Sequence, residues 1–206
     1  MRTCLLVVTM IILSLACAGL ARADDKAAAP APVAAPAASE NQAIKNFTAS
    51  FNDVSDKPRP FPDKFEMFDF SDQKSTIAFG PDQPWRLINF WAAWCPPCIA
   101  ELPSLKALQA KSKLMKGFKV ILLSADMPAS GAALKYLIGQ KNIPMFDAYY
   151  LKDFNLWESF DVSGLPTTII VNPQGQIVYT LAGDADWDSP DAMAFFRTVL
   201  PPSALQ

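Results

Sequence analysis

The sequence predicts an α/β fold in which a mixed sheet carries helices on both faces. Short apolar runs alternate with longer segments of helical periodicity, and two strand-like runs close around a tight turn near the C-terminus. The alternation requires a parallel strand pair with a right-handed crossover, and the closing hairpin adds antiparallel strands. With 51% hydrophobic and 18% charged residues among 206, the chain has enough apolar side chains for one ordinary domain.

The expected elements follow one another in a regular order from residue 61 onward. The run 87–91 is nearly continuously apolar, which is typical of a central strand buried on both faces. The polar residues 71–74 separate two strand-like stretches and predict an N-terminal β-hairpin extension. The expected elements are a hairpin of 65–70 with 76–79, helix 98–115, strand 118–123, helix 131–140, helix 155–160, a hairpin of 167–171 with 176–181, and helix 189–200.

The N-terminal 23 residues have the layout of a secretory signal. A basic Arg2 precedes an apolar run, and the small residues 21–23 predict cleavage before Asp24. A membrane anchor formed by residues 5–21 is an alternative, and lipidation at Cys17 is another. All three alternatives place the folded domain outside the cytoplasm, so we expect a periplasmic protein.

Residues 24–60 are expected to form an Ala/Pro-rich linker and an N-terminal extension. Repeated prolines in 26–39 favour extended chain, either as a tether or as a remnant of signal processing. Phe47 and Phe51, four residues apart, predict one short amphipathic helix after the linker. We expect the folded domain itself to span 61–206.

Charge and cysteine content narrow the function. The chain has 18 basic and 20 acidic residues, a net charge of −2 and no basic run, so we expect no nucleic-acid partner. Of its four cysteines, Cys4 and Cys17 lie in the signal segment, and cleavage would leave Cys95 and Cys98. A structural disulfide usually closes a longer loop, because its entropic gain grows with loop size. A pair this close in sequence therefore favours a redox-active disulfide.

The local pattern around this pair favours thiol chemistry without a further cofactor. Cys95 lies where a buried strand is followed by a helix, so the helix dipole stabilises its thiolate and lowers its pKa. Cys98 lies one turn inside the helix and is expected to resolve the mixed disulfide. Because Pro96 and Pro97 have no N–H to donate, we expect the pKa of Cys95 to be lowered less than in a strong oxidant.

Of three other uses of the cysteine pair, the sequence disfavours one and leaves two open. A structural zinc site needs about four ligands, but the chain has no histidine and too few cysteines, so we expect no metal site. A permanent structural disulfide is one alternative to redox chemistry. Copper(I) binding by the dithiol is the other, since soft metals prefer thiolates.

The run from Asn89 to Cys98, NFWAAWCPPC, followed by Glu101 and Pro103, closely resembles the TlpA/ResA/CcmG branch of thioredoxin-like proteins. The similarity extends over about 61–200 and implies a thioredoxin-like fold. It also implies that Cys95 attacks and Cys98 resolves, that Glu101 is a buried acid of the active-site helix, and that Pro166 is the cis-proline opposite the cysteines.

Spacing supports a role for Glu101, which follows Cys98 by one helical turn and can exchange a proton with its thiol. Neutral Asn89 stands where cytoplasmic thioredoxins have an aspartate, so if any acid acts on the thiol, we expect it to be Glu101 alone. A solvated helix glutamate is the alternative. The expected substrate-contacting residues around the cysteines are Trp94, Pro96, Pro97, Leu165 and Pro166, with Leu165 offering backbone groups to an extended segment.

The resemblance implies a reductant of protein disulfides, of the kind that keeps cysteines open for haem attachment to apocytochrome c or for copper-site assembly. It also implies a DsbD/CcdA-type membrane thiol carrier as electron donor. A copper(I) metallochaperone, a general disulfide oxidase or isomerase, and a binding protein with an inert disulfide are the alternatives. A peroxidase is less favoured, because paired cysteines suit dithiol exchange.

Overall fold

The computed structural model describes residues 38–63, 65–126, 128, 130–141, 143, 147–152 and 156–206, of which 38–40 and 156–157 are described by their backbone alone. The described residues belong to one compact unit. The expected signal or anchor and most of the Ala/Pro-rich linker lie outside the described residues. In the described part, no helix is both long enough and apolar enough to cross a membrane.

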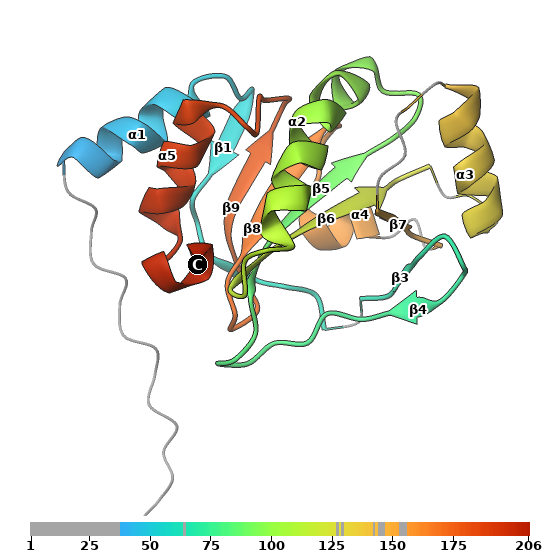
Figure 1. Cartoon of the computed structure of the whole chain (residues 1–206), viewed down its shortest axis with the longest axis horizontal. Helices are drawn as coiled ribbons and strands as arrows, with labels where there is room; N and C mark the ends of the chain where they lie inside the picture. Colours follow the sequence, from blue (N-terminus) through green and yellow to red (C-terminus); the bar gives the residue numbers. More distant parts are fainter. Residues whose placement is uncertain are drawn as a thin grey trace, which may run out of the picture. The chain divides into compact units, whose positions relative to one another are not determined.

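The described residues build a nine-stranded mixed sheet (Figure 1). Its strand order is β1-β9-β8-β5-β6-β7-β3-β4, and β2 also pairs with β9. The pairs β5/β6 and β6/β7 are parallel, and the other pairs are antiparallel. The strands are β1 (Asp53–Ser55), β2 (Arg59–Pro60), β3 (Met67–Phe68), β4 (Lys74–Ser75), β5 (Trp85–Trp91), β6 (Phe118–Ser124), β7 (Ala148–Tyr150), β8 (Thr167–Val171) and β9 (Gln176–Ala182).

Helices cover both faces of this sheet, which confirms the expected architecture. Side chains of α1, α2, α3 and α5 belong to the core on one face, and Phe160 of α4 belongs to the core on the other. In Figure 1, α2 lies in front of the sheet and α4 behind it. The helices are α1 (Ala38–Thr48), α2 (Pro96–Ser112), α3 (Gly131–Gln140), α4 (Leu156–Phe160), α5 (Pro190–Val199) and the 3₁₀ helix η1 (Pro202–Leu205).

The apolar run in β5 is explained by its position between β6 and β8. Successive side chains of a strand point to opposite faces of the sheet. Leu87 and Trp91 therefore belong to the core beneath α2, whereas Ile88 and Phe90 belong to the core beneath α4. A central strand with helices on both faces has no solvent side, so it has no polar alternation.

The folded unit begins earlier than Phe61, so the expected domain start is too late. Strands β1 and β2 pair with β9, and α1 packs against α5. Phe47 of α1 is 4% exposed, and its ring centroid lies 5.0 Å from that of Phe195 and 5.4 Å from that of Trp187. The two strands have three and two residues, too few for an alternating pattern, and the same reason explains why the three-residue β7 was not expected.

The expected N-terminal hairpin is present with shorter strands. β3 and β4 pair antiparallel, and β3 extends the sheet beyond β7. The carboxylate of Asp69 accepts backbone N–H groups of Ser71 and Gln73 at 2.8 and 2.9 Å, which forms the turn between them. The second strand lies at 74–75 instead of 76–79, because this turn brings the chain back sooner than the polar spacing suggested.

Substitutions at two glycines of α3 can test how closely this hairpin packs against the helix. A Cβ on Gly131 would lie 2.4 Å from the backbone of Phe70, whereas a Cβ on Gly139 would meet nothing within 4 Å. We expect Gly131→Ala to lower the free energy of unfolding by more than about 1 kcal/mol, as overpacking does. Gly139→Ala is the matched control, and we expect it to be neutral or to stabilise by up to about 1 kcal/mol. Urea unfolding of both variants measures the difference, and equal stabilities would contradict the described contact.

Candidate functional site

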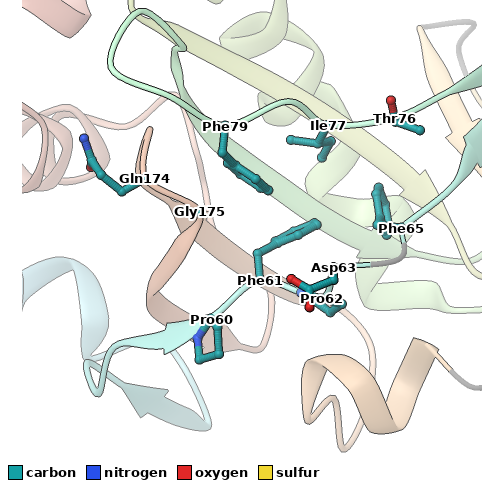
Figure 2. Close-up of a pocket in the computed structure, with 10 residues that line it drawn as sticks. All are labelled: Pro60, Phe61, Pro62, Asp63, Phe65, Thr76, Ile77, Phe79, Gln174 and Gly175. Carbon is teal, nitrogen blue, oxygen red and sulfur yellow. The ribbon is translucent and has the colours of Figure 1, made fainter. Parts of the chain in front are cut away.

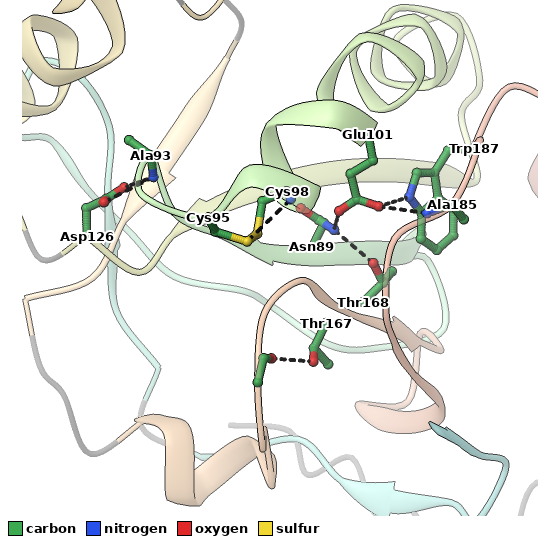
Figure 3. Close-up of a disulfide and its surroundings, with 11 residues drawn as sticks. Asn89, Ala93, Cys95, Cys98, Glu101, Asp126, Thr167, Thr168, Ala185 and Trp187 are labelled. Atoms are coloured by element: carbon green, nitrogen blue, oxygen red, sulfur yellow. Dashed lines mark hydrogen bonds between the residues drawn. A yellow bond between two sulfur atoms is a disulfide. The ribbon is translucent and has the colours of Figure 1, made fainter. Parts of the chain in front are cut away.

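The cysteine pair lies where β5 is followed by α2. Cys95 is the N-cap of α2, and its Sγ accepts the backbone N–H of Cys98 at 3.3 Å (Figure 3). Pro96 and Pro97 begin the helix and have no N–H, so the first helical donor that reaches the sulfur is that of Cys98. The local sequence thus places one N–H of the helix N-terminus on the Cys95 sulfur.

Cys95 and Cys98 form a disulfide, with their Cα atoms 5.3 Å apart. Cys95 is 4% exposed and Cys98 is fully buried, with 0% exposure. Cys98 is therefore the more enclosed of the two cysteines. The roles of attacking and resolving thiol remain predictions.

The residues expected to contact a substrate lie at the end of the sheet that carries Cys95. Trp94 is 65% exposed, and Pro96 and Pro97 are exposed beside it. Leu165 is half-buried and Pro166 is buried, and the bond between them is cis. Pairing of Thr167 with Phe90 puts this loop at the end of β5 that precedes the cysteines. The structure therefore places all five residues at the same end of the sheet.

Asp126 fixes the segment that precedes the disulfide, a contact that the sequence did not reveal. Its two carboxylate oxygens accept the backbone N–H of Ala93 at 2.9 and 3.1 Å, and Ser124 Oγ donates to Oδ2 at 2.7 Å. Asp126 follows the end of β6, which is parallel to β5, so the two strand ends meet at one edge. The strand expected at 118–123 ended before this residue, so no role was predicted for it.

Glu101 is buried beside the disulfide, with 3% of its surface exposed. Its Oε1 accepts Asn89 Nδ2 at 2.8 Å, and its Oε2 accepts Trp187 Nε1 at 2.7 Å and the backbone N–H of Ala185 at 3.2 Å. Figure 3 shows this group of side chains beside Cys98. The alternative of a solvated helix glutamate is therefore wrong.

Burial is the main influence on the protonation of Glu101. Loss of solvent raises the pKa of its carboxyl from 4.5 to about 7, and the negative charge of Asp184 acts in the same direction. The hydrogen bonds from Trp187, Asn89 and Ala185 oppose this rise, because they stabilise the charged form. A carboxyl with this pKa can take up and release a proton near neutral pH.

Asn89 is part of this arrangement as a neutral hydrogen-bond donor, and the expectation that Glu101 is the acid that acts stays a prediction. Asn89 is fully buried on β5, and its Nδ2 donates to both Glu101 and Thr168 Oγ1, the latter at 2.9 Å. Its Oδ1 is buried and has no hydrogen-bond partner among the described residues. A neutral side chain at this position thus acts as the donor that links the acid to β8.

Trp187 was missed by sequence reasoning. It lies in the loop between β9 and α5, is fully buried, and its backbone N–H donates to Ser104 Oγ at 3.1 Å. Ser104 Oγ in turn donates to the Glu101 carbonyl at 2.8 Å. A buried tryptophan usually finds an acceptor for its indole N–H, and this rule was the only available signal.

A pocket of about 330 Å³ lies away from the disulfide (Figure 2). Its lining includes Pro60, Phe61, Pro62, Phe65, Phe79 and Gly175. Gly175 is in the turn that follows β8, and Val171 of β8 is opposite Arg86 at the start of β5. The pocket is thus at the other end of the strands from Cys95. Within the described residues, no group of three or more His, Cys, Asp or Glu could hold a metal ion.

Because the pKa of Glu101 is raised in the folded protein, we expect the free energy of unfolding to depend on pH. The folded protein holds the proton of Glu101 more tightly than the unfolded chain does. The resulting stabilisation of the fold is therefore complete below about pH 4.5 and is lost as the pH rises through about 7. Relative to Glu101→Gln, we expect wild-type protein to lose on the order of 3 kcal/mol between pH 4.5 and pH 8. Urea unfolding across this range, with the exposed Glu158→Gln as control, measures it. Parallel curves for wild type and Glu101→Gln would contradict the burial of an ionisable acid.

Known proteins with similar sequences include thiol-disulfide oxidoreductases. The family model described as the AhpC/TSA family matches residues 58–180. Thiol-disulfide oxidoreductase ResA of Bacillus thuringiensis (strain Al Hakam) is 31% identical over 97 residues, which cover 47% of this chain and 54% of that protein. ResA of Bacillus subtilis (strain 168) is 30% identical over 96 residues, covering 47% and 51%. The chain thus spans about half the length of these curated relatives.

Solved structures support the same fold. A candidate thiol-disulfide oxidoreductase from Bacteroides vulgatus is 28% identical with a TM-score of 0.52, covering 66% of this chain and 92% of that one. A candidate thiol:disulfide interchange protein DsbE from Chlorobium tepidum is 24% identical with a TM-score of 0.54, covering 69% and 97%. Since the family model matches more than half of the sequence, the chain belongs to the AhpC/TSA family and has its thioredoxin-like fold.

Proposed function

We propose that this protein is a thiol-disulfide oxidoreductase that acts through Cys95 and Cys98. The observation that carries the proposal is the disulfide at the N-terminus of α2, with the buried acid Glu101 one helical turn beyond it. A permanent structural disulfide would need neither this acid nor the exposed apolar Trp94 beside it. The relatives named as thiol-disulfide oxidoreductases support the same conclusion.

The reaction transfers two electrons from the reduced pair to a substrate disulfide. The Cys95 thiolate attacks one substrate sulfur, which forms a mixed disulfide and releases the other substrate sulfur as a thiolate. The Cys98 thiolate then attacks the Cys95 sulfur, and the second substrate thiolate leaves. The products are a substrate dithiol and the Cys95–Cys98 disulfide, so the enzyme is oxidised as the substrate is reduced. This cycle uses the disulfide itself and no further cofactor.

Cys98 must lose a proton before it attacks, and the carboxylate of Glu101 accepts this proton. Cys98 is fully buried, so water has little access to its thiol. The Glu101 carboxyl follows it by one turn on the same helix, and its pKa of about 7 leaves it partly ionised at neutral pH. The carboxylate takes the proton from Cys98 and returns it when the pair is reduced again.

We further propose that the protein works in the periplasm as a reductant of protein disulfides. The layout of residues 1–23 as a secretory signal supports the location. Resemblance to the TlpA/ResA/CcmG branch supports substrates such as apocytochrome c or copper-site proteins, and a DsbD/CcdA-type membrane carrier as the donor of electrons. The exposed Trp94, Pro96 and Pro97, with Leu165 and Pro166, form the surface for such protein partners.

Trapping with Cys98→Ala tests the oxidoreductase assignment. Without the resolving thiol, the mixed disulfide on Cys95 has no internal route to release, so we expect substrate proteins to remain attached. Non-reducing gels followed by mass spectrometry of periplasmic extracts measure the adducts, and Cys95→Ala is the matched control without an attacking thiol. Adducts on neither variant, or equal adducts on both, would contradict the assignment.

The reduction potential tests the direction of electron flow. For a reductant we expect a value of roughly −180 to −270 mV, because oxidants of the DsbA type lie near −120 mV. Equilibration with defined glutathione ratios, read out by thiol alkylation, gives the value. A potential close to that of DsbA would show that the protein oxidises its substrates instead.

A further inference from the structure

We propose that Trp187 is a positioning residue for Glu101, and that helix α1, with Phe51 just after it, keeps water away from Trp187 and from the carboxyl group that its indole N–H contacts. The N-terminal segment, which precedes the cysteines by about fifty residues, would then control the proton that Glu101 exchanges with Cys98. This inference rests on the proposed function for its consequence in catalysis. Its structural part is testable without any redox reaction.

The contact between Trp187 and Glu101 is direct and enclosed. Trp187 Nε1 donates to Glu101 Oε2 at 2.7 Å, and both residues are buried, with exposures of 0% and 3%. The same loop contributes the backbone N–H of Ala185 to Oε2 at 3.2 Å. Glu101 therefore takes two of its three donors from the β9–α5 loop, and the side-chain donor of that loop is Trp187.

Phe47 of helix α1 and Phe51, just after that helix, pack against the Trp187 ring. The ring centroids of Phe47 and Phe51 lie 5.4 and 5.7 Å from that of Trp187. Phe195 of α5 packs against Phe47 at 5.0 Å, so the cluster joins α1 to α5. Because Phe47 is 4% exposed, it excludes water from this side of the indole. Loss of its ring would admit solvent toward Trp187 and the carboxyl group behind it.

Asn89 identifies which oxygen of Glu101 can carry the proton. Trp187 Nε1 and the Ala185 N–H can only donate, so Oε2 stays an acceptor in both protonation states. Asn89 can turn its amide and present Oδ1 in place of Nδ2, and Oδ1 has no other partner among the described residues. The proton thus belongs on Oε1, facing Asn89, while Trp187 fixes Oε2.

Among the described residues, one charged group influences the protonation of the Glu101 carboxyl. Asp184, in the β9–α5 loop, is the charged group that influences the carboxyl, and it is exposed. The groups from β5 and β8, Asn89 and Thr168, are uncharged, as is Trp187. On α2 itself the titrating neighbour is Cys98, which is held in the disulfide in this structure. Titration of the oxidised protein therefore reports the protonation of Glu101 without a contribution from the Cys98 thiol.

Carbon-13 labelling of glutamate measures this titration directly. The sequence contains four glutamates, Glu40, Glu66, Glu101 and Glu158, so the side-chain carboxyl spectrum is simple. The signal missing from Glu101→Gln assigns the buried group. The experiment follows its chemical shift from pH 4 to pH 9 in the oxidised full chain and in four variants, namely Trp187→Phe, Phe47→Ala, Phe51→Ala and Phe61→Ala.

The variants are expected to shift the midpoint in opposite directions. Trp187→Phe keeps an aromatic ring but removes the donor, so the midpoint moves up by about one pH unit, the size typical for one hydrogen bond to a charged group. Phe47→Ala and Phe51→Ala admit water, so the midpoint moves down from about 7. Phe61→Ala is the control, because Phe61 is also 4% exposed but belongs to the core on the other face.

An unchanged midpoint in Trp187→Phe would overturn the proposal, as would equal shifts in Phe47→Ala and Phe61→Ala. If Phe47→Ala does not fold, Phe51→Ala decides whether the N-terminal segment shields Glu101, since Phe51 lies just after α1 and is only partly buried. The pH profile of disulfide reduction by the same variants gives the functional readout. A shifted titration with an unshifted profile would overturn the proton role of Glu101 in the proposed function and leave the positioning role of Trp187 intact.

Discussion

The carboxyl group of Glu101 is buried beside a disulfide, and such a group is tolerated only where enough donors meet it. Its three donors come from β5, through Asn89, and from the β9–α5 loop, through Ala185 and Trp187. The sheet register and the packing of α5 must both be correct for these groups to converge. The same burial gives the acid its pKa of about 7, so the fold and the proposed chemistry depend on one interaction.

Each layer of the molecule contributes to this environment. Helix α2 carries the cysteines and the acid, β8 supplies Thr168 beneath Asn89, and α1 with α5 encloses Trp187. Asp126, at the end of β6, holds the chain just before Cys95. The exposed residues around Cys95 thus lie over a buried and hydrogen-bonded interior, which suits the proposed role of Glu101 as a fixed proton acceptor.

The sequence predicted what is local and missed what is distant. Cys95, Cys98 and Glu101 share one helix, so spacing alone indicated their relation, and the long apolar strands were evident because they are buried on both faces. Trp187 is 86 residues from Glu101 in the sequence. Asn89 bonds to Glu101 and Asp126 to Ala93, and each of these contacts joins two different elements, so no sequence periodicity could predict it. The strands β1, β2 and β7 were missed because two or three residues cannot display alternation.

The central claim is that Glu101 accepts the proton of Cys98 when the mixed disulfide is resolved. Reduced protein reacts with an aromatic disulfide such as Ellman's reagent in two steps, and the second step, release of thionitrobenzoate by Cys98, is followed by absorbance across pH. We expect the wild-type rate of this step to rise with a midpoint near the pKa of about 7, and Glu101→Gln to be slower and to lack this midpoint. Equal rates with the same pH profile in both proteins would contradict it.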